Sequence, residues 1–348
     1  MAETGQRTPG AEDHARVIQL IFGAMAGQLM GAAVRLRVLD RIGDGERHAD
    51  DLAAECGTHP QATTRMLRAL AGLGLLAETA SGAFSATATG ALLRTDRPDS
   101  KASLVGLFAD PAMLRAWEHL DDSVRTGERS FDKVFGTDFF GYLKDHQALS
   151  EQFNEAMSQG TRGVAELLPE ACDFGRFTTV ADVGGGDGTL LAAVLRAYPD
   201  VRGIVYDTAE GLAQADPVLD RDGLTGRCAL VAGDFFAAAP EGADAHLLKS
   251  VLHDWSDEQS AVILGHCRRA LPDHGRVLIV EVVLPETADT GYGGLPYLSD
   301  LNMLVNLGGR ERTRAEFEEL CGRSGLAVAS VTPLAEGNPY CLIEARPV

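Results

Sequence analysis

The sequence lacks the cysteine patterns that bind zinc or build a disulfide framework. Its six cysteines include no C-x-x-C pair, and no group of His and Cys has the spacing of a zinc site. We therefore expect neither a structural zinc nor extracellular cross-links. The thiols are predicted to be small, buried side chains in the reducing cytoplasm.

Cations are scarce, and no export signal or long apolar run is found. Lys and Arg number 31 against 50 Asp and Glu, so the net charge is −19. Nucleic acids and anionic membranes are bound by basic surfaces, so neither is expected as a partner. Residues 1–13 are polar, and no uninterrupted apolar run of about 18 residues is present to span a bilayer. We expect a soluble, cytoplasmic protein.

Glycine is concentrated in a segment that reads Asp182-Val-Gly-Gly-Gly-Asp-Gly188. The residues before it are apolar and β-branched like a buried strand, and those after it place leucines at helical spacing. At such a strand-to-helix turn, Gly184 and Gly186 let the backbone approach a ligand beside the free N–H groups of the helix. The segment predicts a ligand-binding loop.

Two acidic residues indicate which ligand fits. Asp207 ends the next apolar strand, where its carboxylate is placed to accept hydrogen bonds from a ribose. The glycine spacing differs from the Gly-x-Gly-x-x-Gly of dinucleotide sites, and Asp187 inside the loop would repel a pyrophosphate. S-adenosylmethionine (SAM), with a ribose, an ammonium and a sulfonium group, suits these residues. A tight turn without a ligand is the alternative.

The chain divides into four predicted parts. Residues 1–13 form a disordered tail, 14–100 a winged-helix dimerisation domain, 101–170 a helical linker and substrate lid, and 171–348 the SAM-binding domain. In the last part strands and helices alternate, which predicts an α/β fold with a Rossmann-like, doubly wound sheet and an antiparallel C-terminal hairpin. The expected strands are 178–183, 203–207, 228–232, 244–249, 276–283, 326–332 and 339–346, and the expected helices are 189–198, 209–215, 257–270 and 313–324.

The N-terminal part begins with an apolar helix, expected over residues 15–39. This helix is too apolar to lie in water, so we expect it in a homodimer interface. Residues 48–78 have the pattern of a helix-turn-helix with a wing. Its second helix carries only two cations in an acidic protein, so a dimerisation or lid module is favoured over DNA recognition.

Candidate catalytic residues follow the later strands. Ligands of open α/β sheets bind at the carboxyl ends of strands, and His253 lies just beyond such an end. Either Glu281 or Glu311 is placed to hold its imidazole in one tautomer. After the third strand, Asp234 is a candidate to accept from an adenine amino group and Phe235 to stack on the adenine. Taken singly, each of these residues is equally compatible with a structural role.

Four motifs together resemble the class I SAM-dependent O-methyltransferases of the plant caffeate and flavonoid type and their bacterial relatives in aromatic polyketide tailoring. They are Asp182–Gly188, Gly233-Asp-Phe-Phe236, Leu248-Lys-Ser-Val-Leu-His-Asp-Trp255 and Gly308-Gly-Arg-Glu-Arg-Thr313. The resemblance covers almost the whole chain and implies that His253 is the general base, flanked by Glu281 and Glu311. The implied SAM contacts are Asp182, Gly184, Gly186, Asp207, Asp234, Phe235, Lys249 and Ser250, and the candidate acceptor contacts are Met157, Asp254, Asn302, Met303 and Asn306.

This resemblance implies methyl transfer from SAM to a phenolic hydroxyl of a small aromatic natural product, with S-adenosylhomocysteine (SAH) as product and no metal. A phenol has a pKa of about 10 and a His of about 6.5, so proton transfer before attack is uphill by roughly 3–4 units. Positioning and partial transfer must close that gap. Two alternatives stay open: a SAM-binding relative that has drifted to decarboxylation or hydroxylation, and a SAM-sensing DNA-binding regulator. The region 101–170 matches only loosely, so the acceptor and its reacting hydroxyl are not specified.

Overall fold

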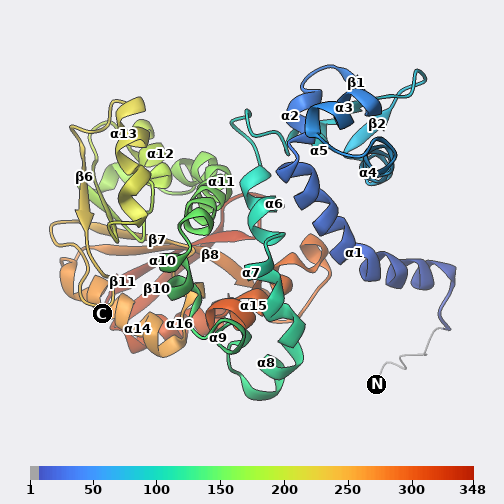
Figure 1. Ribbon diagram of the computed structural model, residues 1–348. Coiled ribbons are helices and arrows are strands. Elements are labelled where there is room, and N and C mark those ends of the chain that lie inside the picture. The colour runs from blue at the N-terminus through green and yellow to red at the C-terminus, as the bar shows by residue number, and fades with distance from the viewer. Residues whose placement is uncertain (1–7) are drawn as a thin grey trace. The chain divides into compact units, whose positions relative to one another are not determined.

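The computed structural model describes residues 8–348, apart from the side chain of Tyr292, and the chain divides into two compact units (Figure 1). One unit extends to Leu114 and the other runs from Arg115 to Val348. The division falls inside the region 101–170, so the helices of that region belong partly to each unit. Of the predicted tail, residues 1–7 lie outside the described range and residues 11–13 form the first turn of helix α1.

The first unit is helical with one small sheet. Helices α3 and α4 are separated by a short turn and followed by a hairpin, which β1 joins in the order β1-β3-β2. Pro60 starts α4, where its missing N–H is not needed by the helix. The elements are α1 (Ala11–Arg35), α2 (Val38–Ile42), β1 (Glu46–His48), α3 (Ala49–Cys56), α4 (Pro60–Gly72), β2 (Leu76–Glu78), β3 (Ala83–Ala86), α5 (Ala88–Ala91), α6 (Ala102–Phe108) and α7 (Pro111–Leu114).

Helix α1 exposes much apolar surface within its own unit. By length and composition, it is the one helix of residues 8–348 that could cross a membrane, and this differs from our expectation that no segment qualifies. The same properties occur in helices that bury their apolar face against another protein chain. The side chains that are more than half exposed include Val17, Ile18, Leu20, Ile21, Phe22 and Met25.

The second unit is built on an eight-stranded sheet. Strands β4 to β8 are parallel, in the order β8-β7-β4-β5-β6, and β11 pairs antiparallel with both β8 and β10. The predicted Rossmann-like sheet with an antiparallel C-terminal hairpin is confirmed. The strands are β4 (Thr179–Val183), β5 (Arg202–Asp207), β6 (Cys228–Ala232), β7 (Ala245–Lys249), β8 (Arg276–Leu284), β9 (Arg312–Thr313, beside β8), β10 (Leu326–Pro333) and β11 (Tyr340–Pro347).

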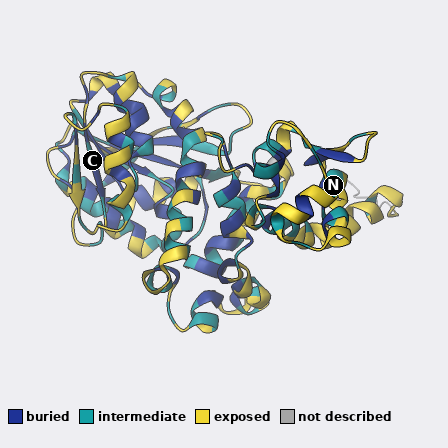
Figure 2. Cartoon of the chain, turned by 45° about the horizontal axis from the view of Figure 1, so that its top comes forward, coloured by how far each residue is buried: buried dark blue, intermediate teal, exposed yellow. Residues whose placement is uncertain are grey.

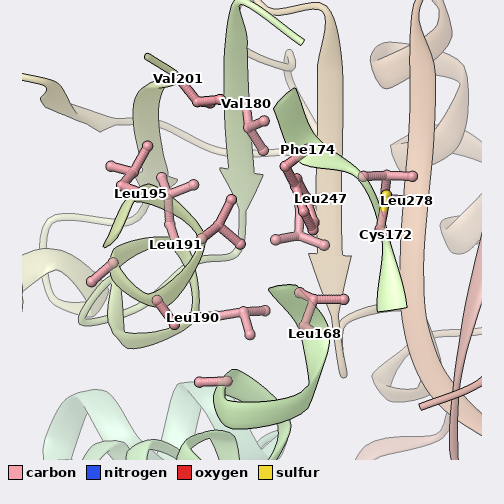
Figure 3. Close-up of a cluster of buried hydrophobic side chains, with 14 of the residues drawn as sticks. Leu168, Cys172, Phe174, Val180, Leu190, Leu191, Leu195, Val201, Leu247 and Leu278 are labelled. Atoms are coloured by element: carbon pink, nitrogen blue, oxygen red, sulfur yellow. The ribbon is translucent and has the colours of Figure 1, made fainter. Parts of the chain in front are cut away.

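Helices cover both faces of this sheet. Leu247 and Leu248 are adjacent in β7 and fully buried, yet they belong to different apolar clusters. Because successive side chains of a strand point to opposite faces, each face has its own core. Figure 3 shows the first of these cores, where Leu168 and Leu191 lie close to Leu247. In Figure 2 the buried residues are concentrated in the sheet and on the inner sides of its helices.

Most helix boundaries follow local signals. Thr313 accepts a hydrogen bond from the backbone N–H of Glu316, so the predicted capping box is confirmed. The helix expected over 209–215 is wrong, because Pro217 is tolerated only in a first turn and the α-helix therefore begins at Ala215. The helices are α8 (Leu120–Thr126), α9 (Ser130–Phe135), α10 (Phe139–Asp145), α11 (Gln147–Ala171), α12 (Thr189–Ala197), α13 (Ala215–Arg221), α14 (Asp257–Ala270), α15 (Leu295–Asn302) and α16 (Arg314–Arg323).

Candidate active site

The glycine loop turns sharply from β4 into α12. Gly184, Gly186 and Gly188 have φ values of +74°, +55° and +73°, which side chains with a Cβ rarely adopt. A Cβ on Gly184 would lie 2.8 Å from the side chain of Val251. Gly188 is the N-cap of α12, so the first N–H groups of that helix open toward the loop. The loop is shaped for close approach of a ligand.

Asp207 joins the loop to the end of the neighbouring strand. Its carboxylate accepts hydrogen bonds from the backbone N–H groups of Gly186 at 2.8 Å and Thr208 at 2.7 Å. Burial raises the pKa of Asp207, while these N–H groups oppose that shift. Each carboxylate oxygen keeps a further lone pair, which suits the hydroxyl groups of a ribose.

A buried acidic group lies directly behind the loop. Asp182 is 2% exposed, and its Oδ2 has no hydrogen-bond partner among the described residues. Burial, and then the nearby Asp207, raise the pKa of Asp182 to about 7, and Lys249 opposes this. Lys249 donates from Nζ to Thr161 at 3.1 Å, and burial lowers its pKa. A cationic nucleoside suits this surrounding, because it would offset the buried negative charge.

Helix α11 supplies two residues that sequence reasoning missed. Ser158 donates to Oδ2 of Asp187 at 2.7 Å, and Thr161 accepts from Lys249. The other oxygen of Asp187 accepts from the backbone N–H of Thr189, so this carboxylate also stabilises the start of α12. Ser158 and Thr161 stand three residues apart, which places them on one helical face. That spacing was the available signal. Met157, a predicted acceptor contact, is half-buried one residue before Ser158.

The candidate adenine contacts lie after β6. Oδ1 of Asp234 accepts from the N–H of Phe236 at 2.8 Å, so Asp234 stabilises the turn after β6. Its second carboxylate oxygen is available to accept from a ligand. Phe235 is half-buried, and its ring packs edge-on against Phe236, with centroids 5.0 Å apart, and against Trp255. The aromatic group offers a flat surface for a base.

The predicted catalytic residues converge. His253 lies on the short turn Leu252–Asp254, and its Nδ1 is 3.1 Å from Oε1 of Glu311 and 3.7 Å from Oε2 of Glu281. The other ring nitrogen, Nε2, is 3.4 Å from Oδ1 of Asp254. A carboxylate only accepts hydrogen bonds, so Nδ1 carries the proton and a neutral His253 presents Nε2 as an acceptor.

Burial and charge act in opposite directions on His253. Burial alone would lower its pKa, but the carboxylates of Glu281, Glu311 and Asp254 raise it to about 10. Burial raises the pKa of Asp254 to about 7, against the attraction of His253. The site therefore stabilises an imidazolium, and a proton received by His253 is held there.

Both glutamates are held by further hydrogen bonds. Oε1 of Glu281 accepts from the backbone N–H groups of Val251 at 3.0 Å and Leu252 at 2.9 Å. Oε1 of Glu311 also accepts from the hydroxyl of Ser299 at 2.6 Å. Glu281 thus stabilises the turn that carries His253, and Glu311 orients the imidazole ring of His253.

Two residues of the Gly308–Thr313 motif support the same turn without having been predicted. Arg312 is 1% exposed and donates to the carbonyl oxygens of Leu252 at 2.9 Å and Trp255 at 3.0 Å. It also pairs with Asp257. Gly309 lies directly against the backbone of His253. The motif itself was the available signal, because paired glycines and two arginines stand beside the candidate Glu311.

Three predicted acceptor contacts lie on one continuous segment. Asn302 ends α15, and Met303 and Asn306 follow in the π-helical turn Met303–Leu307, all three being buried. That turn packs against the turn of His253. Ser250, a predicted SAM contact, adopts a φ of +52° at the end of β7, and its hydroxyl lies 3.4 Å from that of Tyr340.

The catalytic cluster also contains the donor types of a metal site. One atom each of His253, Glu281 and Glu311 lies within 4.8 Å of the others. Oε2 of Glu281 and Oε2 of Glu311 are buried and have no hydrogen-bond partner among the described residues. The expected absence of a metal therefore needs a direct test.

Comparison with known proteins gave matches over nearly the whole chain. A family model of the O-methyltransferase domain matches residues 117–327, and one of the O-methyltransferase dimerisation domain matches residues 18–96. O-demethylpuromycin-O-methyltransferase of Streptomyces alboniger is 46% identical, over 97% of this chain and 90% of the relative.

Two solved structures have the same fold. The structure of LaPhzM has a TM-score of 0.90 and 40% identity, covering 96% of this chain and 99% of that protein. NcsB1 from neocarzinostatin biosynthesis, in complex with SAM and 2-hydroxy-5-methyl naphthoic acid, has a TM-score of 0.77 and 32% identity, covering 93% and 96%.

Proposed function

This chain belongs to the O-methyltransferase family, and on that premise we propose that it transfers the methyl group of SAM to a phenolic hydroxyl with His253 as general base. Membership makes it an enzyme that methylates aromatic acceptors with SAM, and the dimerisation domain supports a homodimer. What we propose beyond family membership is that the acceptor group is a phenolic hydroxyl, that His253 is the base, and that the individual residues make the contacts given below. The observation that carries it is the 3.1 Å contact between Nδ1 of His253 and Glu311.

The loop residues fit SAM. Gly184 allows close approach, Asp207 has lone pairs left for the ribose hydroxyls, and the unpaired Oδ2 of Asp182 favours a cation nearby. Phe235 offers its face to the adenine, and Asp234 keeps an oxygen for the adenine amino group. When bound, SAM supplies a methyl group already activated on its sulfonium sulfur. The protein then has to orient the acceptor and accept its proton.

The carboxylates around His253 adapt it to that proton. A pKa of about 10 matches that of an ordinary phenol, so transfer from the hydroxyl to Nε2 is close to balanced rather than uphill by roughly 3–4 units. The imidazolium that results is stabilised by Glu311 and Glu281. A matched pair of this kind shifts the proton easily as the oxygen attacks the methyl group.

The matched pKa values also have a consequence in the free enzyme. At pH 7 His253 holds a proton before the acceptor arrives. The complex of a phenolate with this imidazolium contains the same number of protons as the complex of a phenol with neutral His253. Both routes lead to the same reactive complex, which requires the loss of one proton from enzyme and acceptor together.

The test compares His253→Ala with His274→Ala, which removes an exposed histidine of the turn before β8. Turnover of SAM to SAH with a panel of hydroxyarenes should fall about 10²–10⁴-fold in His253→Ala and stay unchanged in the control. SAH binding should be equal in all three proteins. If His253→Ala methylates the acceptors at the normal rate, the base assignment is wrong.

A metal-assisted mechanism is the second candidate, favoured by the cluster of His253, Glu281 and Glu311. We propose that the enzyme works without a metal, because Nδ1 of His253 is already directed at Glu311. Treatment with a chelator should leave turnover unchanged. A loss that Mg²⁺, Mn²⁺ or Zn²⁺ restores would favour the metal instead.

Product analysis and DNA binding distinguish the other two functions that the sequence left open, a SAM-binding decarboxylase or hydroxylase and a DNA-binding regulator. A decarboxylase or hydroxylase would change its acceptor without converting SAM to SAH, whereas we expect one SAH for each methylated product. A DNA-binding regulator would bind duplex DNA with an affinity that falls steeply with salt, and the net charge of −19 disfavours such binding.

A further inference from the structure

A cavity of about 410 Å³ lies at the amino-terminal ends of three central strands, away from the candidate active site. Its lining includes Thr179, Arg202 and Cys228, the first residues of β4, β5 and β6. Asp207, at the other end of β5, belongs to the candidate active site. Five steps of about 3.3 Å along the strand separate Arg202 from Asp207 by roughly 16 Å. This space, named here the β5–β6 cavity, is therefore a separate feature of the sheet.

The β5–β6 cavity forms where one face of these two strands has no helix on it. On the opposite face, α12 and α13 pack against Val205 and Cys228 in the first apolar core. Residues 233–244, which lead from β6 to β7, contain neither a helix nor a strand. Ala229 and Val231 of β6 are accordingly exposed, Val231 by 38%. A ligand that covered this face would remove apolar surface from water.

The lining combines an apolar floor with polar groups at one end. Ile204 and Ala229 are register neighbours on β5 and β6, and both line the cavity. Side chains two residues apart on a strand lie on the same face, so the side chain of Arg202 shares this face with that of Ile204. Thr179 is the register neighbour of Arg202 on β4. A guanidinium and a hydroxyl group thus stand at the strand ends beside the apolar floor.

Two guanidinium groups of this lining are not neutralised by a carboxylate. Arg202 is exposed, and within residues 8–348 its side chain makes no hydrogen bond or ion pair. Arg227 donates to the backbone carbonyl oxygens of Leu195 at 2.8 Å and Val201 at 2.9 Å, and no acidic side chain of the described chain pairs with it. The cavity therefore retains local positive charge in a protein whose net charge is −19.

We propose that the β5–β6 cavity binds a small organic carboxylate with a flat, apolar body. The guanidinium of Arg202 presents paired N–H donors that match the two oxygens of a carboxylate. The apolar body would cover Ile204 and Ala229, which lie side by side on the flat surface of the sheet. An inorganic anion would leave this floor in contact with water, and a cation would be repelled by both arginines. The inference is independent of the proposed methyl transfer, because the cavity involves none of its residues.

The test is calorimetry with the full-length enzyme saturated with SAH. The probe is 2-naphthoate, and the control of similar size is the neutral 2-naphthylmethanol. We expect 2-naphthoate to bind with a Kd below about 1 mM, and about tenfold or more tightly than the alcohol, as for a hydrogen bond to a charged group. No binding of 2-naphthoate, equal binding of the alcohol, or tighter binding of inorganic phosphate overturns the inference.

Variants distinguish this cavity from the acceptor site, which also suits an aromatic molecule. Arg202→Gln removes the exposed cation, and Ala229→Trp fills the floor, so each should weaken 2-naphthoate binding about tenfold or more. Arg65→Gln is the matched control, because it removes the same charge at an exposed position of α4 and should leave binding unchanged. Unchanged SAH affinity and thermal unfolding show that each variant is folded. Binding of 2-naphthoate that persists in either cavity variant places the ligand elsewhere and overturns the proposal.

Discussion

Gly309 lies against the turn that carries His253, so closely that a Cβ on Gly309 would come within 2.5 Å of backbone atoms of His253, Asp254 and Trp255. Backbone cannot rotate aside as a flexible side chain can. The same turn is held by Arg312, which donates to the carbonyl oxygens of Leu252 and Trp255. The imidazole is therefore positioned by backbone packing and hydrogen bonds before any ligand arrives.

Gly309→Ala should displace this turn and slow catalysis. A misplacement of about 1 Å can cost about 10²-fold in rate, so we expect a fall of that order in kcat with unchanged SAH affinity. Gly322→Ala on α16 is the matched control, because a Cβ there meets nothing within 4 Å. Steady-state kinetics and calorimetry on both variants provide the measurement. Normal kcat in Gly309→Ala would show that the turn adjusts without consequence.

Sequence patterns predicted the central strands of the sheet well because these strands are buried on both faces. Apolar, β-branched runs such as Thr179–Val183 and Arg276–Leu284 begin and end within a residue of their expected positions. The pattern failed at 209–215, where Pro217 decides where the α-helix begins. The periodicity of apolar residues indicates which face of a helix is buried, but it does not indicate the residue at which an irregular turn ends and the α-helix begins.

In the candidate site, the residues that follow strand ends were predictable and their supports were not. The shared sheet edge brings His253 and Glu281 together, since His253 follows β7 and Glu281 lies near the end of the neighbouring parallel strand β8. Trp117 meets Asn302 across 185 positions of sequence, and no local pattern indicates that contact. Ser158 and Thr161 looked like ordinary polar positions of an amphipathic helix. Long-range contacts made by single polar side chains carry little periodic signal.

The pH dependence of kcat/KM should reflect the raised pKa of His253. For a phenol of ordinary acidity, with a pKa of about 10, the reactive complex has lost one proton that His253 retains up to pH 10. Log kcat/KM should therefore rise with a slope of one from about pH 6 to 9, without levelling off. A wild-type profile that is already flat above pH 7 would contradict the raised pKa.

Glu311→Gln provides the comparison for this profile. The neutral amide removes one of the carboxylates that raise the pKa of His253, so the profile should level off at a lower pH than in the wild type. Its absolute rate should fall as well, because the imidazolium is less stabilised. An unchanged profile would show that Glu311 acts on orientation alone.

The apolar face of α1 should be covered in solution by a second copy of the chain. Leu20 and Ile21 are 63% and 58% exposed within one chain, and the dimerisation domain match begins at residue 18. Placing two charges there should convert the dimer into a monomer, so Leu20→Lys/Ile21→Lys is expected to sediment at half the mass. Val124→Lys, at an exposed apolar position of α8, is the control and should stay dimeric. A dimer that persists in the double variant would place the interface elsewhere.

His246 should make the protein less stable in mild acid. Its side chain is fully buried in β7, with Nε2 2.9 Å from the carbonyl oxygen of Pro240. Burial lowers its pKa from 6.5 to about 4, against the smaller effects of hydrogen bonds with the backbone of Pro240 and Cys267. The folded state thus favours neutral His246. The stabilisation is complete above pH 6.5 and is lost as the pH falls toward 4.

The size of this effect follows from the shift. A difference of about 2.5 pKa units corresponds to about 3 kcal/mol of unfolding free energy lost across that range. Urea unfolding at several pH values should show this loss in the wild type beyond that of His246→Gln. Glutamine does not titrate and retains an N–H donor for Pro240. The pH dependence of the unfolding free energy of His246→Gln therefore reports the contribution of all other groups. Because burial and not a nearby charge causes the shift, added salt should leave the difference between the two slopes unchanged. Parallel pH dependences of the two proteins would mean that His246 becomes charged without unfolding the sheet.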